Sequence, residues 1–325
     1  MSLWANNGSY YESPELSREL RFALLPTLRF RQFADIKDPD QQGRYKGATF
    51  HWNIYSKVSA DSGLSTRNLV ETNTMPTGNF TITQGTLTID EYGLGVPYTG
   101  KYDDLSEHPV KEIIHKALKI DCKEALDTMV AEEFEKTPLR IIASGASSAG
   151  TDTSAVILTT DSVCTLTNNV ALGKAHIRTI VTTMKERNIP GYTDDDYYAL
   201  AWPSTFDPLA EDLESVQQYT ETGYGHIMRG EKGRFNACRF VEQTNVGKDD
   251  MSTAAAEWTN SKSNWAFFFG ADTVAEAIAV PEEVRGKIPL DYGRDKGIAW
   301  YYLGGAGICH TAHAQARILM WDSAE

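Results

Sequence analysis

The 325-residue sequence has little positive charge and no long apolar run. It contains 31 lysines and arginines against 44 aspartates and glutamates, so a duplex-DNA reader or a lipid-docked protein, each needing a basic face, is disfavoured. No stretch approaches the roughly 20 apolar residues that span a bilayer. The first twenty residues lack the charged and apolar regions of a secretory signal, and we therefore expect the product to form in a cytoplasm.

The sequence also lacks the motifs of common catalytic and metal sites. Its cysteines, Cys122, Cys164, Cys238 and Cys309, lie far apart without a C-x-x-C pair, so we expect buried free thiols rather than a zinc site. Neither a G-x-S-x-G nucleophile turn nor an H-E-x-x-H helix motif occurs. We therefore expect no catalytic constellation, no metal and no cofactor.

What is present suffices for a sizeable core, in one elaborate domain or two: hydrophobic residues make up 41% and aromatic residues 10% of the chain. Residues 48–58 are rich in aromatic and β-branched side chains and predict a strand, and residues 80–90 alternate with period two. Between them lies a polar excursion of about 20 residues, longer than an ordinary connection. We expect an extended hairpin that packs on another molecule, because it has too few apolar residues for a core of its own.

The clearest predicted element is a long helix over residues 109–137, with apolar residues spaced by three and four from Val110 to Phe134. Ser106 or His108 can cap its start, and Pro138 ends it. At about 1.5 Å per residue the helix is roughly 40 Å long and serves as a spine. Its other face carries several carboxylates, which we interpret as a solvated acidic face: Glu112, Asp121, Glu124, Glu132 and Glu135.

The second half of the chain predicts an inserted α/β region. Residues 141–169 are weakly β, residues 170–193 form an amphipathic helix stopped by Pro190 and Gly191, and residues 197–203 form a buried strand followed by a short helix. The apolar and aromatic end, residues 297–321, predicts a β-pair that turns at Gly304 to Gly307.

Three short stretches could carry chemistry. Gly223, Gly225, Gly230 and Gly233 suggest a phosphate loop, but a strand rather than a helix N-terminus follows them, which favours turn glycines. Asp194, Asp195 and Asp196 could bind a hard cation, although a solvated turn is favoured. Cys309, His310 and His313 resemble a metal triplet, but in a strand the two histidines point to opposite faces.

The first forty residues are the basic part of this acidic chain. Leu16, Leu20 and Leu24 have helical spacing up to Pro26. One interpretation is a capping helix with a solvated charged face, and the other is an arm lying on an acidic neighbouring subunit. In the second case the contacts would come from Arg18, Arg21, Arg29 and Arg31.

The order of elements resembles that of the major capsid proteins of tailed bacteriophages, which have the Hong Kong 97 fold. The more detailed similarity is to the podophage branch, with its G-E-x-G…R-F-x-E pattern and a later arginine, alanine-tryptophan and glycine pattern. The matching positions in this sequence are Gly230, Glu231, Gly233, Arg239, Phe240, Glu242, Arg294 and Trp300.

The resemblance implies an α+β fold with an N-terminal arm at 1–46, a peripheral domain at 47–169, an axial domain at 170–290 and a return to the peripheral domain at 291–325. The peripheral domain would include an extended loop at 53–79 and the spine helix at 106–137. The resemblance also implies pentamers and hexamers in a shell around double-stranded DNA, with portal, scaffold and decoration proteins as partners and the virion as location.

Two other classes of function stay open from the residues alone. One is a cytoplasmic α/β enzyme that uses the glycine loop at 223–233 or the Asp194–Asp196 cluster. The other is a different virion component such as a tail tube or decoration protein, which the spine helix and the inserted α/β region disfavour.

Overall fold

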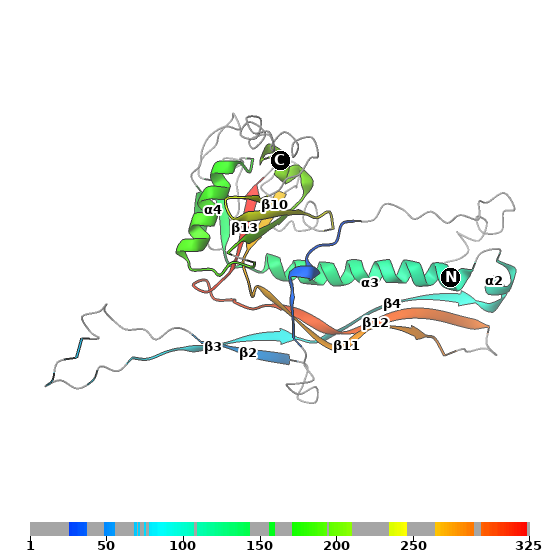
Figure 1. Cartoon of the computed structure of the whole chain (residues 1–325). Coiled ribbons are helices and arrows are strands. Elements are labelled where there is room, and N and C mark those ends of the chain that lie inside the picture. Colours follow the sequence, from blue (N-terminus) through cyan, green and yellow to red (C-terminus); the bar gives the residue numbers. More distant parts are fainter. Residues whose placement is uncertain are drawn as a thin grey trace.

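The computed structural model describes residues 26–37, 49–55, 68–69, 71, 75, 78–106, 109–143, 156–159, 171–193, 195–209, 234–245, 264–288 and 294–323. Within these ranges the chain forms a four-stranded sheet, a seven-stranded sheet, a two-stranded hairpin and helices that cover the two larger sheets. Figure 1 shows an elongated molecule with a compact lobe above one end of the long sheet and the hairpin projecting away from both.

The four-stranded sheet runs in the order β1-β11-β12-β4. Its strands are β1 (Asp35–Lys37), β11 (Val274–Gly286), β12 (Asp295–Ile308) and β4 (Asp90–Thr99). β12 pairs antiparallel with both long neighbours, and β1 joins β11 in parallel. The N-terminal end of the described chain is thereby tied to a strand that lies far later in the sequence.

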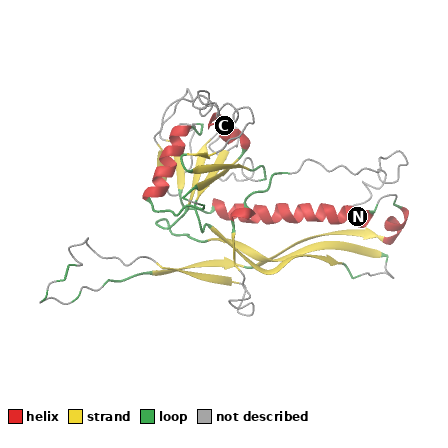
Figure 2. Cartoon of the chain, in the orientation of Figure 1, coloured by secondary structure: helices red, strands yellow, loops and turns green. Residues whose placement is uncertain are grey.

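The predicted spine helix is confirmed as α3 (Val110–Glu135), which lies along one face of the four-stranded sheet (Figures 1 and 2). Its apolar face forms a core with β11, β12 and β4. The capping prediction is wrong: Pro109 is the N-cap, and Ser106 instead follows a short preceding helix, α2 (Gly100–Leu105), as its C-cap. His108 lies outside the described residues.

The compact lobe contains the seven-stranded sheet, in the order β6-β5-β13-β10-β7-β9-β8. Its strands are β5 (Arg140–Ala143), β6 (Val156–Thr159), β7 (Tyr197–Ala201), β8 (Arg234–Phe235), β9 (Cys238–Glu242), β10 (Asn264–Phe269) and β13 (Ile318–Ser323). The predicted second helix is confirmed as α4 (Lys174–Glu186) and covers this sheet (Figure 2).

The central strands of this sheet are buried on both faces. In β10, Phe267 and Phe269 join the core under α3, whereas Ala266 and Phe268 join the core under α4. This two-sided burial explains the uninterrupted apolar sequence at 265–269, because strands covered on both faces have no polar side. The seven-stranded sheet therefore lies between two cores, one shared with α3 and the other shared with α4.

The predicted hairpin is also confirmed: β2 (Thr49–Tyr55) pairs antiparallel with β3 (Ile82–Thr88). It extends away from the rest of the molecule (Figure 1). A two-stranded hairpin alone is marginally stable, so its position depends on what holds its root.

The predicted β-pair turning at Gly304 to Gly307 is wrong. β12 runs straight through these glycines to Ile308, and the chain turns only afterwards, at residues 309–317. The last strand, β13, then enters the other sheet between β10 and β5.

The expected divisions at residues 170 and 291 do not coincide with the sheets. β5 and β6, before residue 170, and β13, after residue 291, lie in the seven-stranded sheet, whereas β11 lies in the four-stranded sheet. Within the described residues, no helix is both long and apolar enough to cross a membrane.

Candidate functional site

The root of the β2–β3 hairpin is anchored on the body by two side chains. Trp52 donates a hydrogen bond from its indole Nε1 to the carbonyl oxygen of Cys309, at 3.1 Å. Leu87, on the paired strand, is 2% exposed. Beyond this root, Tyr55 and Ile82 face each other across the hairpin and are 66% and 51% exposed. The hairpin is therefore fixed at one end and presents apolar side chains at the other.

The glycines of β12 allow this anchoring. A Cβ atom at Gly305 would lie 2.1 Å from the backbone oxygen of Thr88, and one at Gly307 would lie 3.2 Å from the Leu87 side chain. Glycine within a strand often marks the close approach of another backbone. The glycines that predicted a turn are thus the surface on which β3 crosses β12.

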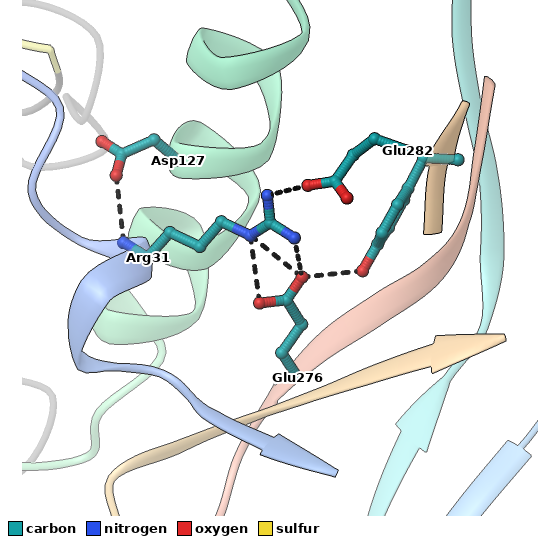
Figure 3. A network of polar contacts seen from close by, with 5 residues as sticks. Arg31, Asp127, Glu276 and Glu282 are labelled. Atoms are coloured by element: carbon teal, nitrogen blue, oxygen red, sulfur yellow. Dashed lines mark hydrogen bonds and ion pairs between the residues drawn. The ribbon is translucent and has the colours of Figure 1, made fainter. Parts of the chain in front are cut away.

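The described N-terminal segment is anchored by a polar network around Arg31 (Figure 3). The guanidinium contacts Glu276 of β11 through Nε, at 3.1 Å to each carboxylate oxygen, and through Nη2, at 2.8 Å. A second ion pair joins Nη1 to Glu282. Tyr302 of β12 donates its hydroxyl to Glu276 at 2.8 Å. The Glu276 side chain is fully buried, so Arg31 supplies the cation that its carboxylate needs.

Backbone contacts fix the same segment to the spine helix. The Arg31 N–H donates to Asp127 of α3 at 3.0 Å, and Asn245 donates its side-chain amide to the other carboxylate oxygen. Burial raises the pKa of Asp127, although the hydrogen bonds from Arg31 and Asn245 act in the opposite direction. Phe30, next in the chain, packs edge-on against Phe134 and Phe267. The segment around Phe30 and Arg31, called the arm base from here on, is thereby held by α3, β11, β12 and the core.

The structure shows a contact of Arg31 within its own chain. Its guanidinium pairs with Glu276 and Glu282 and fixes the arm base, and its expected contact with a neighbour stays a prediction. Arg29 lines an open groove of about 800 Å³ with Phe33, Tyr192 and Tyr198, and its contact with a neighbour stays a prediction. Arg18 and Arg21 lie outside the described residues.

Arg239 of the sequence pattern belongs to a second polar cluster. Arg239 Nε and Arg234 Nη2 bind the two carboxylate oxygens of the buried Asp196, at 2.8 and 2.6 Å. Burial alone would raise the pKa of Asp196, but the hydrogen bonds from Arg239 and Arg234 hold it below its ordinary value. Because these arginines lie on β9 and β8, Asp196 fixes the strand pair that follows the glycine-rich stretch.

The other described positions of the pattern have distinct surroundings. Phe240 packs edge-on against Phe206, at 5.3 Å between ring centroids. Glu242 ends β9, and the carbonyl of Arg294 accepts a hydrogen bond from Gly100. Trp300 is 5% exposed and donates its indole Nε1 to Asp121 of α3 at 2.7 Å. Asp121 was expected on a solvated face and instead joins the spine helix to β12.

The structure describes only part of the stretches that could have carried chemistry. Gly230, Glu231 and Gly233 lie outside the described residues, as do Gly223, Gly225 and Asp194. Asp196 is buried and paired with arginines, so the expectation of a solvated turn is wrong for it. His310 is buried against Asp272, whereas His313 is exposed. Among the described residues, no three His, Cys, Asp or Glu side chains are grouped as metal ligands would be.

The free-thiol prediction is confirmed for three of the cysteines. Cys122, Cys238 and Cys309 are buried and form no disulfide with one another, and Cys164 lies outside the described residues. Burial raises the pKa of the Cys238 thiol, followed in effect by the nearby Asp196. A thiol held neutral in this way is a poor nucleophile, which agrees with a structural role.

Sequence reasoning missed the carboxylates that anchor the arm. Glu276 stands alone in the apolar run 274–280, and Asp127 lies among the apolar positions of the spine helix. Lone carboxylates in such settings are rarely buried without a partner. That signal could have identified both residues, but their partner, Arg31, is 245 positions from Glu276 along the chain.

No protein-family model matches the sequence, and no curated protein matches it. Solved structures do match. The capsid of cyanophage P-SCSP1u has a TM-score of 0.66 at 14% identity, covering 96% of this chain and 93% of that one. The cyanophage Pam1 capsid has a TM-score of 0.65 at 13% identity, with 96% of each chain covered. This chain has the Hong Kong 97-like fold of phage capsid proteins.

A third similar structure comes from a phage of a different host. The acid-stable capsid of Helicobacter pylori bacteriophage KHP30 has a TM-score of 0.65 at 13% identity, and the match covers 100% of this chain and 98% of that one. The predicted fold class is confirmed, and the match extends over the arm base, hairpin, spine helix and compact lobe together.

Proposed function

We propose that this chain is the major capsid protein of a tailed bacteriophage, which self-assembles into pentamers and hexamers of an icosahedral shell around double-stranded DNA. The observation that carries the proposal is the match of nearly the whole chain to several phage capsid proteins. A match of this extent includes the projecting β2–β3 hairpin as well as the cores, and such a hairpin adds little stability to an isolated globular protein.

The hairpin is anchored at its root and uncovered at its outer end, and this explains how subunits would associate. Tyr55, Ile82 and Phe80 are all at least half exposed near its outer end. Burying each large apolar side chain is worth about 1.5–3 kcal/mol, which the isolated subunit does not gain. We infer that a neighbouring subunit covers them. Obligate interfaces commonly bury about 2,000–5,000 Å², and many modest contacts repeated by symmetry make a strong shell.

Under this proposal the two sheets take different places in the shell. The four-stranded sheet with α3 would form the peripheral domain, and the seven-stranded sheet with α4 would form most of the axial domain around the centre of each capsomer.

The acidic balance suits a container for DNA. A wall that carries part of the net charge of −13 on its inner side repels the packaged polyanion, so that the DNA can move and leave. We expect no enzymatic activity. Assembly in the host cytoplasm, and the participation of portal, scaffold and decoration proteins, are further parts of the proposal.

Expression of the chain alone, followed by sedimentation and negative-stain electron microscopy, tests the proposal. Closed shells or rings of five and six are the expected result, if necessary with neighbouring virion proteins co-expressed. A well-folded monomer under all these conditions would refute it. Deleting residues 59–77 separates the alternatives, because it should abolish assembly of a capsid protein and leave an enzyme's chemistry largely intact.

A finer version of this test substitutes only the hairpin surface. Tyr55→Ser with Ile82→Ser should prevent assembly while leaving the unfolding of the subunit unchanged. The matched control is Thr49→Ser with Thr88→Ser, a pair that faces across the same hairpin at its root. Equal assembly of both double variants would mean that the apolar end of the hairpin is not covered by a neighbour.

A further inference from the structure

A groove of about 330 Å³ lies between α3 and β11. Its floor is apolar and is formed by Leu118 and Cys122 of the helix with Ile298 and Trp300 of β12, all of which belong to the core under α3. At its edge, Val284 of β11 is 55% exposed. The groove thus opens the side of a core next to an exposed apolar side chain, which favours an occupant with an apolar surface.

The rim of this groove on α3 is basic. His115, Lys119 and Lys123 line it at intervals of four residues, so they form one row along the helix. All three side chains are exposed, and none has an ion-pair partner among the residues that the structure describes. By contrast, Lys111 and Lys136, at the two ends of α3, are each paired with a carboxylate. The lysines left without a partner are therefore those that face the groove.

The carboxylates on the opposite rim do not neutralise this row. Glu282 is paired with Arg31, and Glu283 is paired with Arg285 at 2.6 Å. The groove therefore keeps a local positive charge on a chain whose net charge is −13. Charge complementarity at such a site favours an acidic occupant.

A helix is the form of occupant that this groove fits. The backbone groups of α3 and β12 are already used within the helix and the sheet, so an extended segment on the floor would find no partners for its own backbone. A helix satisfies its backbone internally. The row from His115 to Lys123 follows about 12 Å of α3, and carboxylates four residues apart on a second helix have the same spacing. A nucleic acid would contact the lysines through phosphates but would leave the apolar floor unused.

We propose that the groove between α3 and β11 binds an amphipathic helix of a partner protein. An apolar stripe of that helix packs on the floor and on Val284, and carboxylates at intervals of four residues pair with Lys119 and Lys123. About three turns of helix cover the row. The contact goes beyond the proposed function, because the groove has this chemistry whether or not the chain forms a shell.

Binding of two model helices to the unassembled full-length chain tests the proposal. Both probes are labelled alanine-based peptides of about 15 residues with one leucine stripe, and they differ only in carrying glutamate or lysine beside that stripe. Non-specific attraction to a chain of net charge −13 would favour the lysine helix. We expect the glutamate helix to bind at least about tenfold more tightly, a preference that requires a local basic site.

An environment-sensitive dye on Val284→Cys locates the bound helix. Its emission should shift to the blue with the glutamate helix, whereas the same dye on Leu94→Cys, outside the groove, should not respond. The two positions are matched, since both pair with Trp300 from opposite sides and are 55% and 51% exposed. Cys164→Ser in both chains confines labelling to the introduced thiol, because the other three cysteines are buried. If the dye itself fills the groove, only the chain labelled at position 284 should lose affinity for the helix, which supports the same location.

The charge part of the proposal has its own control. Lys119→Gln with Lys123→Gln should weaken binding of the glutamate helix about threefold or more, as expected for the loss of two exposed ion pairs. Lys101→Gln with Lys185→Gln removes the same charge from exposed positions outside the groove and should leave binding unchanged.

Three results would overturn the proposal: equal affinity of the two helices, binding without any change at position 284, or equal effects of the two double lysine variants. A blue shift at position 284 that grows with the concentration of the chain alone would show that a second copy covers the groove, which also overturns it.

Discussion

Replacing Arg31 should destabilise the subunit far more than replacing an ordinary surface arginine. Its guanidinium is the cation for Glu276, whose side chain is fully buried, while Arg31 is itself 26% exposed. Breaking a buried pair by removing one partner typically costs about 3–5 kcal/mol, because the remaining charge is buried without compensation. The partial exposure of Arg31 argues for the lower end, about 3 kcal/mol for Arg31→Met.

Removing both charges should restore most of this loss. Arg31→Met with Glu276→Gln leaves no buried ion, and the amide oxygen of the introduced glutamine can still accept the hydroxyl of Tyr302, so we expect a net cost of about 1 kcal/mol. Arg285→Met is the control for a surface pair. Its partner Glu283 is 46% exposed, and such a pair contributes about 0–1 kcal/mol.

The measurement is thermal and urea unfolding of the unassembled subunit, followed by circular dichroism at pH 7. A loss of about 3 kcal/mol corresponds to a decrease of roughly 4–5 °C in the midpoint for a chain of this size. The reasoning would be refuted if Arg31→Met cost no more than Arg285→Met. It would equally be refuted if the double variant were as unstable as the single one, because the buried carboxylate would then not be the cause.

Three further predictions concern the spine helix and β12. Burial, and then a neighbouring glutamate, raise the pKa of Glu135 to about 7. The folded state therefore loses stability as pH rises from about 4.5 to 7. Glu135→Gln should add about 1–2 kcal/mol at pH 8, discounted for partial hydration, but nothing at pH 4, and an equal effect at both pH values would contradict this. Trp300→Phe should cost about 1.5–3 kcal/mol in urea unfolding by removing a hydrogen bond to a carboxylate, and an unchanged midpoint would exclude that bond. Gly305→Ala should cost about 1–3 kcal/mol through its clash with β3, whereas Gly286→Ala, whose Cβ meets nothing within 4 Å, should be tolerated; similar midpoints would show that β3 does not cross there.

The parts of the fold that could be predicted are those in which a local pattern decides the structure. The spine helix from Val110 to Glu135 has one apolar stripe along its whole length, and no strand could use that spacing. The β2–β3 hairpin was predictable for the same reason. Alternate residues of each strand face the same side, and that side is the less exposed one, most strongly at the root. In each case the sequence period and the direction of burial agree.

The prediction of the last β-pair failed because one residue type, glycine, occurs both in turns and in strands that another backbone crosses closely. Gly304 to Gly307 are typical of a turn, yet they lie within β12 because β3 crosses them closely. Strands β10 and β13 are apolar on both faces, so their sequences could not indicate which sheet they join. The ion pair that anchors the arm base could not be predicted, because no local sequence pattern links Arg31 to Glu276.

The hairpin and the described N-terminal segment are anchored in the same way, and this bears on how the fold is used. The hairpin is fixed at its root by Trp52 and Leu87, and the arm is fixed at its base by Arg31. Each anchor lies on the four-stranded sheet: the first on β12 and the residue that follows it, the second on β11 and β12. One sheet under the spine helix therefore sets the position of the hairpin root and of the described N-terminal segment. Contacts that the hairpin makes far from the core can then be accurate, although the hairpin has no core of its own.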